Sequence, residues 1–211
     1  MSNPLVCDRS ASRTSYGDDS AAGDQDRSRP DRGSFTGRRC GPPYASGMPL
    51  VRPASPADVA AIARIYGAAV RTSVATFDLT DPPNIYWEQK IASNECGDHV
   101  LVIEDGTEVV GFAYAAAFRP RPAYAQTRET SVYLAPQAVG VGLGSLIYSQ
   151  LLSLLRADGM HLAVAVIAQP NSASVALHEK LGFELMGTLQ EVGRKFDRWV
   201  DTGWYQLPLE R

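Results

Sequence analysis

The hydrophobic residues of this chain are spaced in two ways, which predict helices and strands in alternation. Val59, Ile62, Tyr66 and Ala69 recur every three or four positions, the spacing of a helix with one apolar face. They follow Ser55-Pro56-Ala57-Asp58, the pattern of an N-terminal capping box with proline at the first helical position. Other apolar runs are short and bounded by turn residues, as strands are. The chain is therefore predicted to be a mixed α/β protein.

The rest of the chain continues this alternation. The predicted elements are a first strand near Val51, a helical piece at 87–91, strands at 100–103 and 109–114 with a hairpin turn at Asp105-Gly106, a strand at 131–134, a helix at 146–155, a strand at 162–167, a helix at 172–180 and a closing strand at 204–209. This pattern alone gives an α/β or α+β class. The length favours one domain with an appendage.

The appendage comprises residues 1–47, which are rich in Ser, Gly, Asp, Arg and Pro. Such a segment buries too little apolar surface to offset its ordering entropy, so we expect it to be disordered. A sharper hypothesis is that translation begins at Met48, directly before the first strand. The domain is then 48–211. The chain begins without the charged and apolar regions of a signal peptide, so we expect no export.

Composition narrows the function classes further. The net charge is −3, which offers no general basic surface for nucleic acid. No apolar run approaches the roughly 20 residues that span a bilayer, so we expect no membrane partner. Cys7, Cys40 and Cys96 are too few and too scattered for a disulfide framework or a zinc site. We therefore expect a cytoplasmic protein without a metal.

The most informative stretch is the glycine-rich loop between the strand at 131–134 and the helix at 146–155. Its residues are Val139, Gly140, Val141, Gly142, Leu143, Gly144 and Ser145. Glycines lack the Cβ atoms that would block a ligand, and the first amides of a helix face an anion favourably. Such turns also occur as plain tight packing. The loop lacks the Lys-Ser/Thr ending of a P-loop, and no well-placed acidic strand follows for a dinucleotide fold. A phosphate site of another kind is predicted.

Further motifs follow in order between about residues 51 and 209. They are Phe118-Arg119-Pro120-Arg121-Pro122-Ala123-Tyr124, Thr127-Arg128-Glu129-Thr130-Ser131-Val132-Tyr133, Asn171-Ser172-Ala173-Ser174, His178-Glu179-Lys180-Leu181-Gly182-Phe183 and the stretch 192–199. Together with the loop, these stretches resemble the GNAT acyltransferase superfamily, most closely its phosphinothricin and methionine sulfoximine (or sulfone) N-acetyltransferases. The resemblance implies the GNAT fold, a central mixed and mostly antiparallel sheet flanked by helices. It also implies acetyl-CoA as cosubstrate, a small amino-acid-like substrate and a homodimer.

The loop departs from the family in one position. The family motif is Gln/Arg-x-x-Gly-x-Gly/Ala, and when it ends on Gly144 its basic or amide residue falls on Val139, which has no side-chain donor. A shifted frame places Gln137 there but moves the motif against the neighbouring strand and helix. We prefer the first frame. Losing a charge-assisted phosphate contact costs roughly 1–3 kcal/mol, so cofactor affinity is predicted to be modest.

Two residues are candidates for proton transfer. Glu129 matches the family's catalytic glutamate in its Glu-x-Ser/Thr-Val-Tyr stretch, and a partly closed cleft would raise its pKa. Alternatively, it is a solvated strand-end residue or pairs with Arg128. Strand parity puts Glu129, Ser131 and Tyr133 on one face unless a bulge intervenes. His178 stands where the superfamily often has a tyrosine that protonates the thiolate; alternatively it only caps helix carbonyls.

The resemblance also implies contact residues. Those for acetyl-CoA are Val132, Tyr133, Leu134, Val139, Gly140, Val141, Gly142, Leu143, Gly144, Ser145, Asn171 and Ser174. Those for the substrate are Arg119, Arg121, Tyr124, Thr127, Glu129 and Ser131. A fork of guanidinium donors suits an acid group, although two arginines in a solvated loop need no such role. Asn171 and Ser174 also fit a turn for local reasons alone.

The leading hypothesis is an acetyl-CoA-dependent N-acetyltransferase for the α-amine of phosphinothricin, methionine sulfoximine or methionine sulfone. Direct transfer in a ternary complex is favoured, because Cys96 lies outside every motif and nothing indicates an acetyl-enzyme. Two alternatives stay open. One is an acetyltransferase for other amines or protein N-termini, and the other is a non-catalytic acyl-CoA-binding module.

Overall fold

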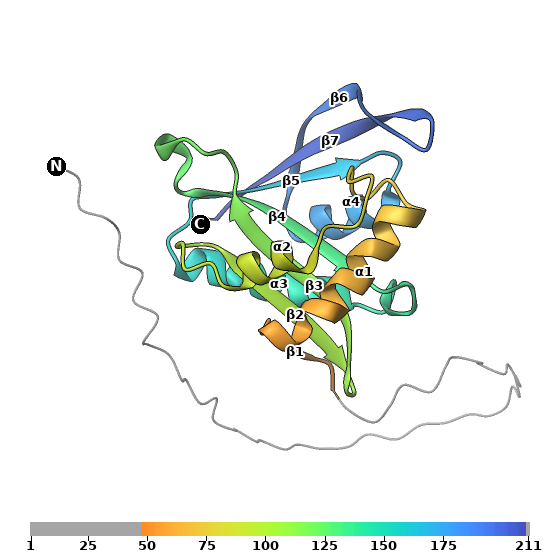
Figure 1. The fold of residues 1–211 in the computed structure, drawn as a ribbon. Helices are drawn as coiled ribbons and strands as arrows, with labels where there is room; N and C mark the ends of the chain where they lie inside the picture. Colours follow the sequence, from red (N-terminus) through yellow and green to blue (C-terminus); the bar gives the residue numbers. More distant parts are fainter. Residues whose placement is uncertain (1–47, 210–211) are drawn as a thin grey trace, which may run out of the picture. The chain divides into compact units, whose positions relative to one another are not determined.

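A computed structural model describes residues 48–209, which form one sheet with helices packed on both of its faces (Figure 1). The strands are β1 (Leu50–Pro53), β2 (His99–Asp105), β3 (Glu108–Ala117), β4 (Thr127–Leu134), β5 (Leu162–Ala168), β6 (Glu184–Lys195) and β7 (Arg198–Pro208). The α-helices are α1 (Val59–Thr72), α2 (Asn84–Ile91), α3 (Leu143–Ala157) and α4 (Ser172–Lys180). Single 3₁₀ turns lie at Pro56–Asp58, Pro122–Tyr124 and Pro136–Ala138.

The seven strands follow the order β1-β2-β3-β4-β5-β7-β6. Every neighbouring pair is antiparallel except β4 and β5, which are parallel. The predicted mixed, mostly antiparallel sheet is therefore confirmed. Only one parallel pair needs a crossover, and α3 supplies it between β4 and β5.

Two hydrophobic cores hold the layers together. Helix α3 buries Ile147, Tyr148, Leu151 and Leu155 against the sheet, and α4 packs on the same side. Helices α1 and α2 cover the opposite face around Trp87. The period-2 alternation of β2 and β3 supplies both cores, since neighbouring residues of a strand point to opposite faces.

The predicted capping box before α1 is confirmed. The Asp58 carboxylate accepts hydrogen bonds from the backbone N–H and the hydroxyl of Ser55, at 2.7 and 2.8 Å. The guanidinium of Arg52 also holds Asp58, at 2.7 and 2.8 Å, and keeps the pKa of that carboxyl well below its usual range. This ion pair ties β1 to the start of α1.

The sheet opens between its two central parallel strands. β4 and β5 pair only through Thr127↔Leu162, Arg128↔Ala163 and Glu129↔Val164. From Thr130 onward no further register pair joins them, so the two strands diverge toward their carboxyl ends. The edges of this wedge present backbone groups that no neighbouring strand occupies, which makes it the natural place for a ligand.

Three sequence predictions about elements need correction. Strand β6 was not predicted, because nearly all of its side chains are exposed and it lacks the alternation that identifies a strand. β7 begins at Arg198, six residues before the predicted start, after a turn in which Phe196 and Asp197 have positive φ. Helix α3 begins at Leu143 rather than 146, so Gly144 and Ser145 lie inside it.

Residues 1–47 lie outside the described residues. The predictions made for them, which are the disordered segment, the roles of Cys7 and Cys40, and translation beginning only at Met48, lie outside them too. Within 48–209, the longest helices are too short or too polar to cross a bilayer.

Candidate active site

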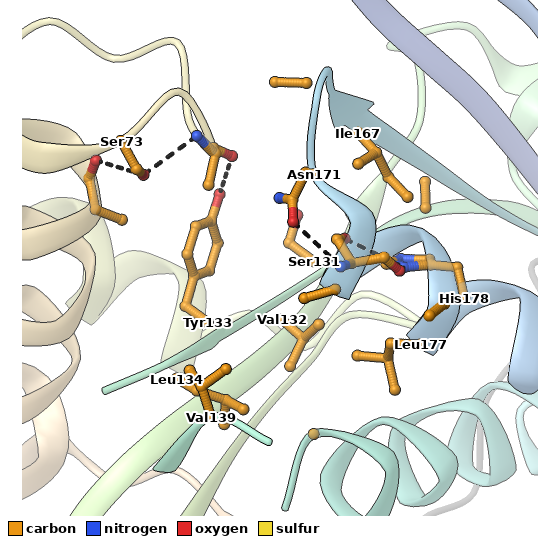
Figure 2. A pocket seen from close by; sticks show the side chains of 18 of the residues that line it. Ser73, Ser131, Val132, Tyr133, Leu134, Val139, Ile167, Asn171, Leu177 and His178 are labelled. Carbon is orange, nitrogen blue, oxygen red and sulfur yellow. Dashed lines mark hydrogen bonds between the residues drawn. The ribbon is translucent and has the colours of Figure 1, made fainter. Parts of the chain in front are cut away.

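A pocket of about 630 Å³ occupies the wedge between β4 and β5 (Figure 2). Its walls are α1 on one side, and the start of α3 together with α4 on the other. Many of the predicted site residues line it. They are Ser131, Val132, Tyr133 and Leu134 on β4, Val139, Gly140, Gly144 and Ser145 in the loop and the start of α3, and Asn171, Ser174 and His178 at α4. The structure thus brings most of the predicted cofactor-binding set to one cavity. Val141, Gly142 and Leu143 belong to the same loop and helix start without lining the pocket.

The three glycines of the loop have different physical roles. Gly140 and Gly142 have φ of +83° and +93°, which L side chains rarely adopt, and a Cβ at either would meet open space. At Gly144 a Cβ would come within 3.3 Å of Leu177 and 3.4 Å of Leu134. The first two glycines therefore shape the loop and leave room beside it, whereas the third lets α3 pack closely on its neighbours.

Beyond Val139, whose N–H donates to the Pro136 carbonyl at 3.4 Å, the backbone amides of this loop have no acceptor among residues 48–209. Among residues 48–209, none of the N–H groups of residues 140–145 donates a hydrogen bond, and the first to do so is that of Leu146, to the Gly142 carbonyl at 3.1 Å. The first turn of a helix always leaves such donors. Here they lie beside a pocket and two glycines with open space, which is the geometry of an anion site.

Asn171 has the local role that its position predicts. It is the N-cap of α4, and its Oδ1 accepts a hydrogen bond from the backbone N–H of Ser174 at 3.1 Å. Its amide nitrogen makes no hydrogen bond to any residue from 48 to 209, and the side chain faces the pocket (Figure 2). One end of the side chain builds the helix, and the other is available to a ligand.

His178 lies at the pocket wall, but its side chain is only 3% exposed and both ring nitrogens are engaged. Nδ1 is 2.7 Å from the Ser174 carbonyl oxygen, and Nε2 is 3.1 Å from the Tyr148 hydroxyl. That hydroxyl lies 2.7 Å from Oγ1 of Thr130. Burial lowers the pKa of His178, so the ring is neutral. Nδ1–H donates to the Ser174 carbonyl, and Nε2 lies within hydrogen-bond distance of the Tyr148 hydroxyl, so both ring nitrogens have a partner.

The environment of Glu129 differs from that of His178. It sits at the last register pair before the wedge opens, and its side chain is half-buried. Burial raises the pKa of its carboxyl, while the nearby charges of Arg119 and Lys90 oppose that shift. The pKa shift predicted from the sequence is thus confirmed in its direction and its cause.

The side chains of Glu129 and His178 lie on opposite faces of the sheet; His178 lines the pocket, whereas Glu129 is not among the lining residues. β4 pairs with β3 without a register shift, so Glu129, Ser131 and Tyr133 share one face, as predicted. Tyr133 packs on Tyr66 of α1, with ring centroids 4.9 Å apart. Thr130 points to the other face, where it meets Tyr148 of α3.

Lys90 is a residue of this site that sequence reasoning missed. It lies in the last turn of α2, and its ammonium lies 4.6 Å from the centroid of the Tyr114 ring and 5.0 Å from that of Tyr86. Burial lowers the pKa of Lys90, and the charges of Asp98 and Glu129 oppose this. Within 48–209 its ammonium forms no hydrogen bond or ion pair. A lysine in the last turn of a helix is expected for the helix dipole alone, so the sequence held no signal for this role.

The predicted substrate loop brings one of its two arginines to the site. The guanidinium of Arg119 lies over the rings of Phe118 and Trp204, 4.9 and 6.0 Å from their centroids, and its charge lowers the pKa of Glu129. Arg121 is exposed, and the exposed Tyr124 packs on Phe118 with centroids 5.6 Å apart. Thr127 lies farther back, where the pairing of β4 and β5 begins.

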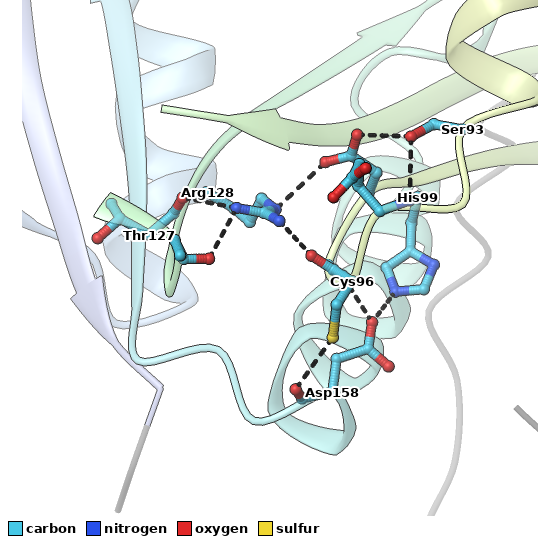
Figure 3. Close-up of polar contacts among 10 residues, drawn as sticks. Ser93, Cys96, His99, Thr127, Arg128 and Asp158 are labelled. Carbon is cyan, nitrogen blue, oxygen red and sulfur yellow. Dashed lines mark hydrogen bonds and ion pairs between the residues drawn. The ribbon is translucent and has the colours of Figure 1, made fainter. Parts of the chain in front are cut away.

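Arg128 points away from Glu129 into a separate polar cluster (Figure 3). It is paired with Asp98 (Nε to Oδ1, 3.2 Å) and donates to the carbonyls of Ala125 and Thr127 at 3.1 Å, and to that of Cys96. The alternative in which Arg128 pairs with Glu129 is therefore wrong. The cluster ties the segment between α2 and β2 to the start of β4, so its role is to hold the strand that carries Glu129.

Among the described residues, no three side chains of His, Cys, Asp or Glu come together as metal ligands would. The thiol of Cys96 lies 3.6 Å from the Asp158 carbonyl and does not line the pocket.

This fold and loop identify a class of protein. A family model described as an acetyltransferase (GNAT) domain matches residues 51–204, so the chain belongs to the GNAT acetyltransferases and is an N-acetyltransferase.

Individual relatives narrow the comparison. The chain is 42% identical over 164 residues to a phosphinothricin N-acetyltransferase of Streptomyces coelicolor, covering 75% of this chain and 95% of that protein. It is 37% identical over 163 residues to an L-methionine sulfoximine/L-methionine sulfone acetyltransferase of Pseudomonas aeruginosa, covering 76% and 94%. A phosphinothricin acetyltransferase of Sinorhizobium meliloti, solved with acetyl-CoA, superposes with a TM-score of 0.73 at 38% identity, covering 76% and 88%.

Proposed function

We propose that this protein transfers the acetyl group of acetyl-CoA to the α-amine of a small amino-acid-like substrate of the phosphinothricin or methionine sulfoximine (sulfone) type. One observation carries the proposal. The unpaired amides of residues 140–145 lie at one end of the wedge, and Glu129 lies at the point where β4 and β5 separate. The names of the relatives support the substrate class, and the Sinorhizobium structure supports acetyl-CoA.

The wedge suits an elongated phosphorylated thioester. Residues 140–145 would receive the pyrophosphate, and the open edge of β4 from Val132 to Leu134 would pair with the amides of the pantetheine arm. The amide nitrogen of Asn171 would donate to the same arm. The bound group supplies the activated acetyl; the chain's own residues place it.

The acceptor would enter from the face that carries Glu129. Its acid group would meet the guanidinium of Arg119 and the ammonium of Lys90, and its amine would lie against the carboxylate. A zwitterion fits this arrangement because it presents both charges. An amine without an acid group would leave the two cations unpaired.

Proton transfer is assigned to Glu129. The substrate amine is protonated near neutral pH and must lose a proton before it can attack. A carboxylate whose pKa is raised by burial accepts that proton more readily than an ordinary one. The prediction that His178 is catalytic stays a prediction. Because both of its ring nitrogens already have partners, we favour a role in fixing α4 against α3.

The test is thiol release from acetyl-CoA, followed with and without phosphinothricin, methionine sulfoximine and methionine sulfone. We expect release that depends on one of these amines. Release only with other amines or with peptide N-termini would favour the first alternative. Acetyl-CoA binding without release for any amine would favour the binding module and overturn the proposal.

Direct transfer, the homodimer and the cytoplasmic location are further parts of the proposal. Intersecting initial-rate lines are expected for a ternary complex, whereas parallel lines would indicate an acetyl-enzyme. Support for a dimer is the edge strand β6, whose Leu185, Met186 and Leu189 are exposed. Sedimentation of the full chain tests it.

A further inference from the structure

Lys90 is a cation for which residues 48–209 provide no counterion. Its ammonium lies 4.6 and 5.0 Å from the ring centroids of Tyr114 and Tyr86, and within those residues it forms no hydrogen bond or ion pair. The side chain is half-buried, so water can take the place of a counterion only in part. An anion brought by a ligand would therefore be stabilised beside this ammonium.

The two carboxylates whose charges act on Lys90 have other roles. These carboxylates, of Asp98 and Glu129, oppose the lowering of the Lys90 pKa by burial. Asp98 lies 3.2 Å from Nε of Arg128 and accepts a hydrogen bond from the Ser93 hydroxyl at 2.8 Å. Glu129 is the proposed base and must meet the substrate amine. Neither carboxylate is left to neutralise Lys90 when a substrate is bound.

Lys90 and Glu129 lie over the same face of the sheet. Tyr114 of β3 pairs in register with Ser131 of β4, and Ala116, two positions along β3, pairs with Glu129. Residues two apart on a strand share a face and are about 7 Å apart, so the ring beneath the ammonium is close to the proposed base. The ammonium is thus placed to reach a small amino acid whose amine contacts Glu129.

The charges on this face exceed neutrality by one positive charge before a substrate binds. Arg119 and Lys90 are cations, and Glu129 is the anion on which both act. The charge of Asp78 is offset by the ammonium of Lys195, whose pKa it raises against the effect of burial. A neutral amino acid brings one ammonium for Glu129 and one carboxylate for the cations. A single carboxylate balances one positive charge and leaves the other, which a second acid group would balance.

We propose that Lys90 binds an acid group on the side chain of the substrate, and so makes the enzyme favour amino acids with an anionic head group. This inference rests on the proposed function, because it assumes that the acceptor amine meets Glu129. Phosphinothricin carries such a head group, a methylphosphinate that is ionised at neutral pH. Methionine sulfone has the same carbon skeleton, and its methylsulfonyl head group has the same tetrahedral shape without the charge.

The experiment compares these two compounds as acceptors for thiol release from acetyl-CoA by the full chain. The quantity is the ratio of kcat/KM for phosphinothricin to kcat/KM for methionine sulfone, in which effects on folding or on acetyl-CoA binding cancel. The variants are Lys90→Met, which keeps an unbranched stem between the rings, and Lys90→Arg, which keeps the charge. Thermal unfolding checks that each variant is folded.

The matched control is Arg156→Gln, which removes one positive charge from another part of the protein. Arg156 is exposed in the last turn of α3, and that helix packs on the opposite face of the sheet from α2. Its replacement therefore changes the net charge as Lys90→Met does, without changing the acceptor side.

We expect a ratio of about ten in the parent, the effect of one charge-assisted contact. Lys90→Met should lower the ratio about tenfold, whereas Lys90→Arg should keep it within about threefold of the parent and Arg156→Gln within about twofold. A parent ratio of one or less overturns the inference without any variant. Equal losses for both compounds in Lys90→Met, or loss of the preference in Arg156→Gln, also overturn it. If the parent acts on neither compound, the proposed function fails, and the inference fails with it.

Discussion

The surroundings of Glu129 and of His178 differ in whether they leave the side chain free to exchange a proton with a substrate. Both side chains are shielded from water, and burial moves both pKa values toward the neutral form, upward for Glu129 and downward for His178. The imidazole has a partner at each nitrogen. The carboxylate instead has two cations in its vicinity, Arg119 and Lys90, whose charges lower its pKa.

This difference separates a group that can exchange a proton with substrate from one that holds helices in place. To act as an acid, His178 would need a second proton on Nε2, and the Tyr148 hydrogen bond would have to reverse. Glu129 needs no such rearrangement, because its ionised form accepts a proton directly. Burial alone thus does not identify a catalytic residue, and the partners of the buried group decide.

Replacing Glu129 by glutamine should have the largest effect. The amide keeps the shape but cannot accept a proton, so kcat should fall by about 10²–10⁴, the usual contribution of a general base. Stability at neutral pH should not fall, because burial disfavours the charge that the substitution removes. Thiol release and thermal unfolding give the two readings. A kcat within threefold of the parent contradicts the assignment.

Breaking the histidine network should affect stability instead. Tyr148→Phe removes the hydroxyl that meets both Nε2 of His178 and Oγ1 of Thr130; Thr130 keeps its hydrogen bond to the Val164 carbonyl, but the buried Nε2 is left unpaired. The free energy of unfolding should fall by roughly 1–3 kcal/mol, with kcat changed less than about fivefold. Urea denaturation of Tyr148→Phe, His178→Gln and the double variant measures the coupling between the two residues. Full stability together with a hundredfold loss of kcat would place the network in the chemistry.

The elements around these two residues were predictable to different degrees. Helix α1 was predicted from its capping box and spacing, and β5 from its apolar run. β6 was not, because a strand at the edge of a sheet with both faces exposed has no hydrophobic pattern to read. The resemblance gave the order of motifs but not the three-pair contact between β4 and β5, and it is this short pairing that creates the wedge.

The residues of the candidate site were also predictable from the sequence only in part. Residues near one another in sequence were assigned correctly to the pocket, as Asn171 and Ser174 were. Lys90 was missed because it reaches Tyr114 from the last turn of a helix that is distant from that strand in sequence. Strand parity predicted the face of Glu129. It could not show that His178 reaches the wedge from the other face, since that depends on how α4 packs.

The acceptor side can be sharpened by comparing its two arginines. Arg119→Gln should raise the KM for the amino-acid-like substrate about five- to tenfold, because the charge of Arg119 acts near Glu129 and would pair with the substrate's acid group. Arg121→Gln is the matched control, with a change below about twofold. Neither should alter the KM for acetyl-CoA. Equal effects of the two substitutions would contradict the assignment of substrate binding to Arg119 rather than Arg121.

The smallest expected effect is on the pH dependence of stability. The pKa of His178 is lowered from 6.5 on folding, so the unfolded chain binds more protons than the native one as the pH drops below 6.5. The stability that the neutral ring contributes is present above that pH and is lost on acidification. Glu129 acts in the opposite sense, because its raised pKa makes ionisation costly as the pH rises. Denaturation curves between pH 5 and 8, values chosen to bracket the imidazole, should show a shallower acid loss in His178→Gln than in the parent. An unchanged slope would contradict the neutral assignment.

The most direct test of Glu129 as the proton acceptor is the pH profile of kcat/KM for amine-dependent thiol release, measured in the parent and in Glu129→Gln. The account predicts an acid limb in the parent, with a midpoint above the ordinary carboxyl pKa of 4.5, and its disappearance in Glu129→Gln. If Glu129→Gln keeps that limb and His178→Gln abolishes it, the imidazole is the base and the account is contradicted.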